Sequence, residues 1–299
     1  MNFMTTNFKT AFSIIALGTC SRLMAQSMFD DFSAETGRGV GNDLSAGYSF
    51  SSKAEVDHGG KVGEVQIDRY DFNDSAKIPW SNDLALLCGV FWSYDDLGLT
   101  GAVPLPHRLE AEGISLGMVR RLSPDWSILA LTRVGFAGDS AAVTGSSFDF
   151  SGSVIASHKV TADFAWDLGM GATLRGRYGV LPVVGARWAF APDWTLSVGF
   201  PRTALVYRAS DRLSWDAGIR FQGGGYRITT APGAGLGNTY LDYHEFRLGC
   251  GVVYRVSDSI SAALDGGVAL SRRFDYYDRN YTLDGASAGY FRLRVTLRL

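Results

Sequence analysis

Charged side chains recur at every second position in several segments whose intervening residues are apolar. In a β-strand, residues with this spacing project from one face. If such strands close into a ring, the charged faces line its interior, where rings of fixed charge set the selectivity of a pore. The residues predicted to line this pore are Asp163, Asp167, Arg187, Asp216, Arg220, Glu245, Arg247, Asp265, Arg292, Arg294 and Arg298.

Arginine is concentrated at the end of the chain. Closing the ring would bring Arg292, Arg294 and Arg298 beside the first strand, whose polar face offers only Ser45, Ser49, Ser51 and Lys53. One wall would then be cationic, which predicts a passive pore for small solutes with some preference for anions. Alternatively, the aspartates and arginines pair across the interior and plug it, and the pattern leaves both interpretations open.

Catalytic signals are weak. His58 and His107 fall in predicted external loops, and His158 falls in a predicted turn. Asp242 and His244 share one face of a strand, and an Asp can orient a His that acts as a base. The spacing identifies no second acidic pair, no Gly-x-Ser-x-Gly segment, no metal-ligand set and no phosphate-binding loop. We therefore expect no enzyme and no cofactor, with an outer-membrane protease or lipid hydrolase as a less favoured alternative.

The run from Tyr276 to Tyr281 combines three tyrosines with Asp278, Arg279 and Asn280. Aromatic and charged loops are common in recognition surfaces. A structural or adhesive barrel that presents its loops to a partner is therefore the second functional hypothesis.

The elements that would position the pore residues alternate strictly. In the C-terminal segment AGYFRLRVTLRL, Phe291, Leu293, Val295, Leu297 and Leu299 share one face. Tyrosine, threonine and three arginines occupy the other. Transmembrane β-strands alternate in this way over about ten residues. The same alternation recurs at residues 44–51, 160–174, 213–222, 246–256 and 260–270.

Short polar motifs separate these strands. They lie at residues 81–84, 123–126, 157–160, 191–194, 210–213 and 257–260, and each ends in an apolar or aromatic residue. Pro, Asp, Asn and Ser favour tight turns. The opposite ends are predicted to carry longer loops at residues 56–61, 95–108, 138–148, 175–179, 223–238 and 272–287. Short turns on one side and long loops on the other are typical of outer-membrane barrels.

This arrangement gives seven hairpins and about fourteen strands. The hairpin between Asp193 and Ser210 leaves only about seven residues per strand, with Pro201 at its tip. A transmembrane strand needs about 9–11 residues. Twelve spanning strands is therefore the lower prediction.

Composition bounds the remaining classes. The 299 residues carry a formal net charge of −2, so nothing indicates a nucleic-acid partner. Mean hydropathy is +0.03, and no apolar run reaches the ~18 residues of a membrane helix. Cys88 and Cys250 lie on strand patterns and are read as packed or lipid-facing thiols, with a disulfide less favoured.

The N-terminus is typical of a secretory signal. Lys9 precedes an apolar stretch at residues 11–18, and cleavage is predicted after Ala25. A lipoprotein attached through Cys20 is the alternative. The predicted organisation is a signal peptide at residues 1–25, a flexible periplasmic segment at 26–42 and a barrel at 43–299.

Together these patterns predict an all-β protein, a transmembrane antiparallel up-and-down β-barrel of about 12–14 strands in the outer membrane. Trp126 and Trp194, each directly after a Pro-Asp turn, would lie in a periplasmic aromatic girdle. The partners implied are outer-membrane lipid, the barrel-assembly machinery through the C-terminal strand, and small solutes. A secreted β-sandwich is the alternative, because sandwiches also alternate.

A segment in the C-terminal half carries a family resemblance. Its features are Leu181-Pro182-Val183-Val184-Gly185, then Pro192 and Trp194, then Phe200-Pro201-Arg202 and Tyr207. The chain resembles an uncharacterised family of Gram-negative outer-membrane β-barrels that bears the description domain of unknown function. The resemblance implies an outer-membrane barrel and no particular activity.

Overall fold

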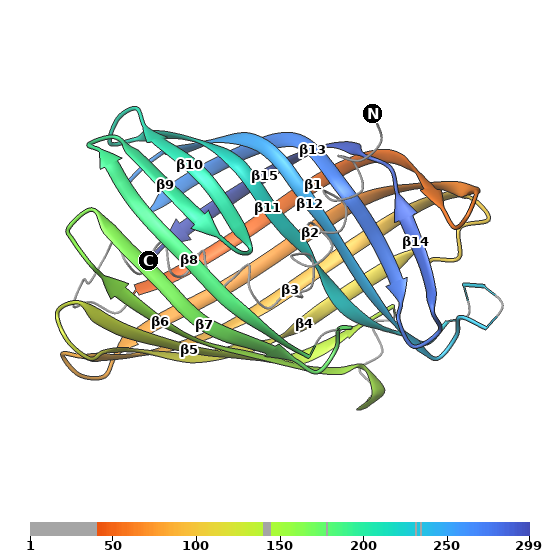
Figure 1. Cartoon of the computed structure of the whole chain (residues 1–299), viewed down its shortest axis with the longest axis horizontal. Helices are drawn as coiled ribbons and strands as arrows, with labels where there is room; N and C mark the ends of the chain where they lie inside the picture. Colours follow the sequence, from red (N-terminus) through yellow and green to blue (C-terminus); the bar gives the residue numbers. More distant parts are fainter. Residues whose placement is uncertain (1–40, 140–144, 178, 231, 234) are drawn as a thin grey trace, which may run out of the picture.

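The computed structural model of the chain describes residues 41–139, 145–177, 179–230, 232–233 and 235–299 (Figure 1). The predicted signal peptide and nearly all of the predicted periplasmic segment lie outside these residues, and Gly41 and Asn42 already belong to the first strand. The elements are β1 (Gly41–Asp57), β2 (Lys61–Pro79), β3 (Leu84–Gly101), β4 (Arg108–Arg121), β5 (Trp126–Gly138), the 3₁₀ helix η1 (Gly145–Ser147), β6 (Phe148–Lys159), β7 (Phe164–Thr173), β8 (Val180–Ala191), β9 (Trp194–Gly199), β10 (Arg202–Arg208), β11 (Leu213–Ile228), β12 (Thr239–Arg255), β13 (Ile260–Tyr276), β14 (Tyr281–Gly285) and β15 (Ala288–Arg298).

The strands form one closed antiparallel barrel. From β1 to β13, each strand pairs with the next, and β15 pairs with both β13 and β1. The short β14 also pairs with β13 and β1, so β14 and β15 together form one strand of the ring. The barrel therefore has fourteen strands around its circumference. Closure is complete to the rim, where Asn42 and Leu299 exchange backbone hydrogen bonds of 3.1 and 2.8 Å. The predicted up-and-down barrel is confirmed, at the upper end of the predicted strand count.

No helix in the described part of the chain is long and apolar enough to cross a membrane.

The outer surface of the barrel is apolar. On β15, Phe291, Leu293 and Val295 are each about 45% exposed, whereas Tyr290 and Arg292 on the other face are buried. Exposed valine, leucine and aromatic side chains continue this surface around the ring, for example at Leu264. The apolar stripe therefore faces outward and is not packed between two sheets, so the sandwich alternative is wrong.

Five of the short turns at one end of the barrel contain the same hydrogen bond from a backbone N–H to a side-chain hydroxyl. In four four-residue turns, a Ser at the second position accepts a backbone hydrogen bond from the residue two positions on. Thr161 does the same for Asp163 in a fifth turn, so this turn occupies residues 160–163. The prediction of a turn at residues 157–160 is wrong by four residues, because Ser157, His158 and Lys159 continue β6 and Thr161 has the role predicted for Ser157.

Strands at the other end run further than predicted. β11 continues to Ile228 through the glycines at 223–225, and the predicted loop at 272–287 contains the end of β13 and all of β14. These extensions bury apolar side chains inside the barrel. We call this cluster the apolar seal, and its members are Val56, Val65, Ile67, Leu97, Val103, Leu105, Leu109, Ala137, Tyr226, Ile228, Leu236, Leu241, Tyr243, Phe274, Tyr276 and Leu283.

The wall has one low sector. β9 has six residues and β10 has seven, and in Figure 1 their hairpin ends well short of the neighbouring strands β8 and β11. Beyond the hairpin, β11 turns toward the opposite strand β5, with Arg227 paired to Gly138 in parallel. The short hairpin predicted from the sequence is therefore present, within a ring of fourteen positions.

The outward apolar surface gives a test in bilayers. Val295 lies at the centre of the apolar face of β15, whereas Leu299 lies at the rim. We expect Val295→Arg to destabilise folding into vesicles by about 2–4 kcal/mol, and Leu299→Arg by about 0–1 kcal/mol. Urea-dependent folding, followed by heat-modifiable gel migration, measures both. Equal effects of the two changes would contradict a membrane-embedded outer face.

Candidate functional site

An internal cavity of about 1350 Å³ occupies the turn end of the barrel. Most of its lining comes from β6 to β10, and the ends of β2 to β5, β11 and β12 complete the wall. The turns that precede β3, β5 and β7 surround its mouth. Alternation directs small polar side chains into it, such as Ser153 and Ser157 from β6 and Thr195 and Ser197 from β9. The cavity is therefore a polar space that opens among the short turns.

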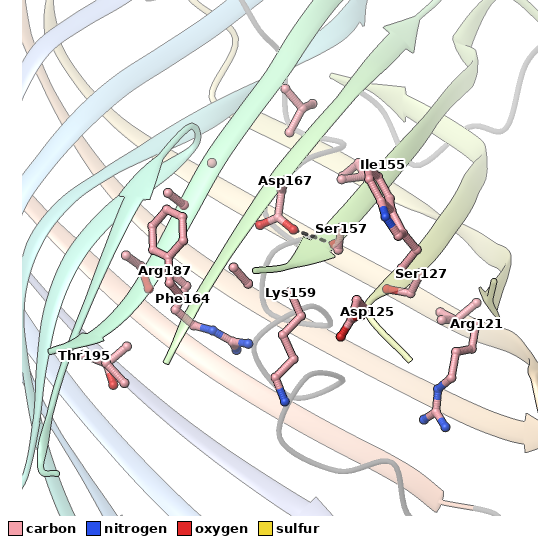
Figure 2. A pocket seen from close by; sticks show the side chains of 18 of the residues that line it. Arg121, Asp125, Ser127, Ile155, Ser157, Lys159, Phe164, Asp167, Arg187 and Thr195 are labelled. Carbon is pink, nitrogen blue, oxygen red and sulfur yellow. Dashed lines mark hydrogen bonds between the residues drawn. The ribbon is translucent and has the colours of Figure 1, made fainter. Parts of the chain in front are cut away.

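Charged groups of both signs line this cavity. Asp167 of β7 accepts a hydrogen bond from the Ser157 hydroxyl, and Arg187 of β8 and Lys159 of β6 project into the same space (Figure 2). Arg202 of β10 binds Asp216 of β11 at 2.8 Å. The lining can therefore hold polar solutes through hydrogen bonds without a strong net field.

Four of the eleven predicted pore residues line the cavity: Asp163, Asp167, Arg187 and Asp216. The other seven lie elsewhere. Arg220 pairs with Asp265 at 3.4 Å, and Arg298 pairs with Asp43 at 3.2 Å near the rim. The remaining four, which lie on the wall made by β12 and β15, are Glu245, Arg247, Arg292 and Arg294.

A buried ionic cluster fills the barrel behind that wall. Glu245 accepts hydrogen bonds from Arg247 at 2.6 Å and from Arg272 at 2.8 Å, and Glu245 and Arg272 have no exposed surface. The two arginines also donate to Ser49 and Ser51 of β1. Nearby, Arg292 binds Asp71 of β2 at 3.0 Å. The wall predicted to be cationic is thus compensated by carboxylates, which matches the alternative in which ion pairs plug part of the interior.

Sequence reasoning missed several partners in this network. Arg272 was assigned to an external loop, and Asp71, Arg69 and Asp95 were not assigned to the interior. Arg69 forms a buried bidentate pair with Asp95. Alternation along β2 places Arg69, Asp71 and Lys77 on one face and was the signal that could have identified them.

The apolar seal closes the interior at the loop end. Phe274, Tyr276 and Leu283 have no exposed surface, and the Tyr276 hydroxyl donates to the Pro104 carbonyl at 2.8 Å. Pro104 belongs to the β3–β4 connection, so this connection is folded into the barrel mouth. Tyr276 is consequently part of the seal and not of a recognition surface.

Asp139 fastens a second connection over the seal. Its carboxylate accepts backbone hydrogen bonds from Thr229 at 3.0 Å and from Thr230 at 2.8 Å, and it also accepts their hydroxyls. Burial alone would raise the pKa of the Asp139 carboxyl, but the hydrogen bonds outweigh burial and hold that pKa below its ordinary value. The β5–β6 and β11–β12 connections are therefore joined above the barrel.

Asp242 and His244 lie on one face of β12, as predicted, close to the charged side chains of Arg177, Arg273 and Asp275. His244 stacks on Phe221 with ring centroids 5.7 Å apart, and Asp242 accepts a long backbone hydrogen bond from Arg177 at 3.5 Å. The pair is packed within the wall. Within the described residues, no group of three or more His, Cys, Asp or Glu could hold a metal ion, and Cys88 and Cys250 are free thiols.

Comparison with known proteins addresses the fold. A family model described as domain of unknown function (DUF6268) matches residues 99–283. Among solved structures, the chain is similar to the COG4313 outer membrane channel from Pseudomonas putida F1, with 11% identity and a TM-score of 0.50 over 87% of this chain and 95% of that one. A comparison with curated proteins gives no match.

Two further barrels are similar at lower scores. They are the toluene transporter TodX from Pseudomonas putida, with 10% identity and a TM-score of 0.41 over 88% and 90% of the two chains, and the translocator domain of the autotransporter NalP from Neisseria meningitidis, with 9% identity and a TM-score of 0.43 over 93% and 96%.

The buried ionic cluster predicts a large loss on removing its single acid. Glu245→Gln leaves Arg247 and Arg272 buried without a negative partner, and we expect a loss of about 3–5 kcal/mol in the free energy of unfolding. Urea unfolding in vesicles measures it.

The matched control is Asp284→Asn, because Asp284 is 71% exposed and lies 3.7 Å from Arg273. We expect this change to cost less than about 1 kcal/mol. A loss for Glu245→Gln no larger than that of the control would show that the cluster does not hold the wall together.

Proposed function

The chain belongs to the DUF6268 family, and we propose that it is an outer-membrane channel for small solutes whose vestibule is the cavity at the turn end. The observation that carries this proposal is the cavity itself. A barrel that served only to present loops could have a completely filled interior. In this barrel the ionic cluster and the apolar seal fill only parts of the interior. Instead, one sector stays open and polar.

Orientation follows from the connections. Short turns lie at the periplasmic side of outer-membrane barrels and longer loops at the outside. The cavity then opens to the periplasm, and the apolar seal closes the outer end. We propose that the C-terminal strand β15, which pairs with β1, is presented to the barrel-assembly machinery before the ring closes.

The adhesive alternative has less support. Of the aromatic residues that suggested a recognition loop, Tyr276 is buried in the seal, and Tyr281 stacks on His58 with ring centroids 3.9 Å apart. These rings stabilise the loop end internally. Tyr277 stacks on Tyr240 at 6.0 Å, which joins two connections rather than offering a free platform.

A channel closed by a packed seal predicts a gain on loosening the seal. Phe274→Ser combined with Tyr276→Ser removes two fully buried rings. We expect the open probability in planar bilayers to rise severalfold over the unmodified protein. The absence of conductance from both proteins, each shown to be folded by heat-modifiable migration, would contradict the channel proposal.

We expect the ion selectivity of the channel to depend on the charges that line the cavity and not on the ion-paired wall made by β12 and β15. In the loosened background, Arg187→Glu reverses one charge in the vestibule, and we expect a cation-to-anion permeability ratio about twofold higher. The control is Arg279→Glu, an equal charge change in the exposed β13–β14 connection. Equal reversal potentials for the two variants would contradict the assignment of the cavity as the conducting path.

A further inference from the structure

The buried ionic cluster contains more arginine side chains than carboxylates. Two of its arginines each bind a carboxylate of their own, whereas two others share one. The one-to-one pairs are Arg69 with Asp95 and Arg292 with Asp71, and the shared acid is Glu245, which binds Arg247 and Arg272. Four cations of the cluster therefore face three anions.

The members of the cluster meet at Ser49 of β1. The direct partners of Ser49 across the sheet are Arg69 of β2 and Arg292 of β15. The Ser49 hydroxyl also accepts a hydrogen bond from Arg247 of β12 at 2.9 Å. Direct partners on one face of an antiparallel sheet have Cβ atoms about 4.5–5.5 Å apart. The ion pairs therefore form one cluster, in which the charge of each pair acts on the others.

The charges around the cluster do not supply a further free acid. Asp265 is the sheet partner of Arg292, but its carboxylate lies 3.4 Å from Arg220. Arg294, two residues along β15, adds another cation that Arg292 and Arg220 both repel. The buried Nε of Arg294 has no hydrogen-bond partner among the residues that the structure describes. The arginines therefore still outnumber the acids when these neighbours are counted.

This excess charge cannot be removed by proton loss. A buried lysine or histidine can become neutral, whereas a guanidinium stays protonated in proteins. The Arg247 guanidinium lies 4.7 Å from the centroid of the Tyr290 ring, and the ring face favours a cation without neutralising it. A buried charge without a counter-charge destabilises the folded state. The cluster therefore needs one more negative charge.

Three hydrogen-bond donors mark a place for it. Nη2 of Arg247, Nη1 of Arg272 and the hydroxyl of Tyr243 have no hydrogen-bond partner in the described part of the chain. All three residues are at most 2% exposed. Both arginines act electrostatically on the Tyr243 hydroxyl, so the three groups are neighbours. Buried donors without a partner are rare and indicate a bound water or ion.

Charge and enclosure decide which species fits. A water molecule would accept hydrogen bonds from these donors but would leave the excess charge in place, whereas an anion does both. The site lies directly below the apolar seal, where the Tyr243 ring stacks on Phe274 with centroids 4.9 Å apart. A small anion suits this enclosed position, and a monovalent one matches the excess of one charge in the cluster.

We propose that the ionic cluster binds one small monovalent anion, of the size of chloride, against Arg247, Arg272 and Tyr243. Ring closure assembles the site, because Ser49 and Ser51 of β1 hold the two arginines that come from β12 and β13. The anion consequently binds the closed barrel and not the unfolded chain, and it stabilises the closed barrel by mass action. This role is independent of the channel proposed above.

The first test measures urea unfolding in vesicles while chloride replaces gluconate at constant ionic strength. Gluconate carries the same charge but is too large for an enclosed site. Between about 1 mM and about 100 mM chloride, we expect the unfolding equilibrium constant to fall at least tenfold. A change of less than twofold would overturn the proposal.

Two matched variants locate the effect. Tyr243→Phe removes one donor and keeps the stacked ring, and we expect it to reduce the effect of chloride to less than about threefold. The control is Tyr226→Phe, because the Tyr226 hydroxyl lies in the same interior, 3.4 Å from both Arg69 and Asp95. We expect this variant to keep the full effect of chloride. Equal chloride dependence in the two variants would contradict the assigned site.

A charge variant tests the excess itself. Arg247→Gln leaves three cations and three anions in the cluster, and we expect chloride to change its unfolding equilibrium constant by less than about twofold. A chloride dependence as large as that of the unmodified protein would contradict the role of the excess charge. If this variant does not fold, as heat-modifiable migration would show, the comparison of the two tyrosine variants decides the proposal.

Crystals of the unmodified protein grown in bromide give the direct observation. Bromide scatters anomalously and water does not. We expect an anomalous peak within hydrogen-bond distance of at least two of the three donors on Arg247, Arg272 and Tyr243. Density at this position without an anomalous peak would identify a water molecule and would overturn the anion site, as would bromide found only on the outer surface.

Discussion

The structure depends on the pairing of backbone N–H and C=O groups in a medium that offers no hydrogen bonds. Each unpaired group in the hydrocarbon core costs several kcal/mol, so a sheet in lipid must close. Here closure joins β1 to β15 along nine consecutive residue pairs, and the rim is fixed by the exchange between Asn42 and Leu299. The shortest strands of the ring are β9 and β10, and beyond their hairpin β11 pairs with β5 through Arg227 and Gly138.

A ring of fourteen strands encloses more space than its own side chains need, and this barrel fills the space in three ways. At the loop end, apolar residues pack as they would in a soluble core. Along β12, β13 and β15, charged groups pair through Glu245 and Asp71, and the paired arrangement limits the cost of burying arginine. The remaining sector is polar, and its cavity is bordered by the short turns at residues 80–83, 123–125 and 161–163.

The fold could be predicted largely from local patterns. The alternation of apolar and polar residues can be read along a single strand without knowing its neighbours. The prediction was therefore correct for the two faces of β15 and β11 and for the short β9–β10 hairpin. Turn chemistry located five of the six short turns. The error at Val160–Asp163 arose because Ser157 and Thr161 carry the same hydroxyl, and only pairing with β5 and β7 shows which of them is the turn residue.

The interior could be predicted only in part, because partners come from strands far apart in the chain. Arg247 meets Ser49 and Arg272 meets Ser51 only once the ring has closed, and the register decides which acid each arginine reaches. The extension of β11 through its glycines was also missed, since glycine favours a loop by propensity alone and tertiary packing overrides it. For these two reasons the position of the cavity could not be predicted from the sequence.

The central claim is that the first and last strands close one ring within a single chain. Ser45 and Thr296 are direct partners with side chains on the same face, and their pair lies between hydrogen-bonded pairs, where Cα atoms are about 4.5 Å apart. Oxidation of Ser45→Cys with Thr296→Cys, in membranes and without other cysteines, should give a monomer whose gel mobility shifts and is restored by reductant, whereas Ser45→Cys with Arg294→Cys, two residues out of register, should link poorly. Links that form only between chains, or equally in both pairs, would contradict the closed barrel and the account built on it.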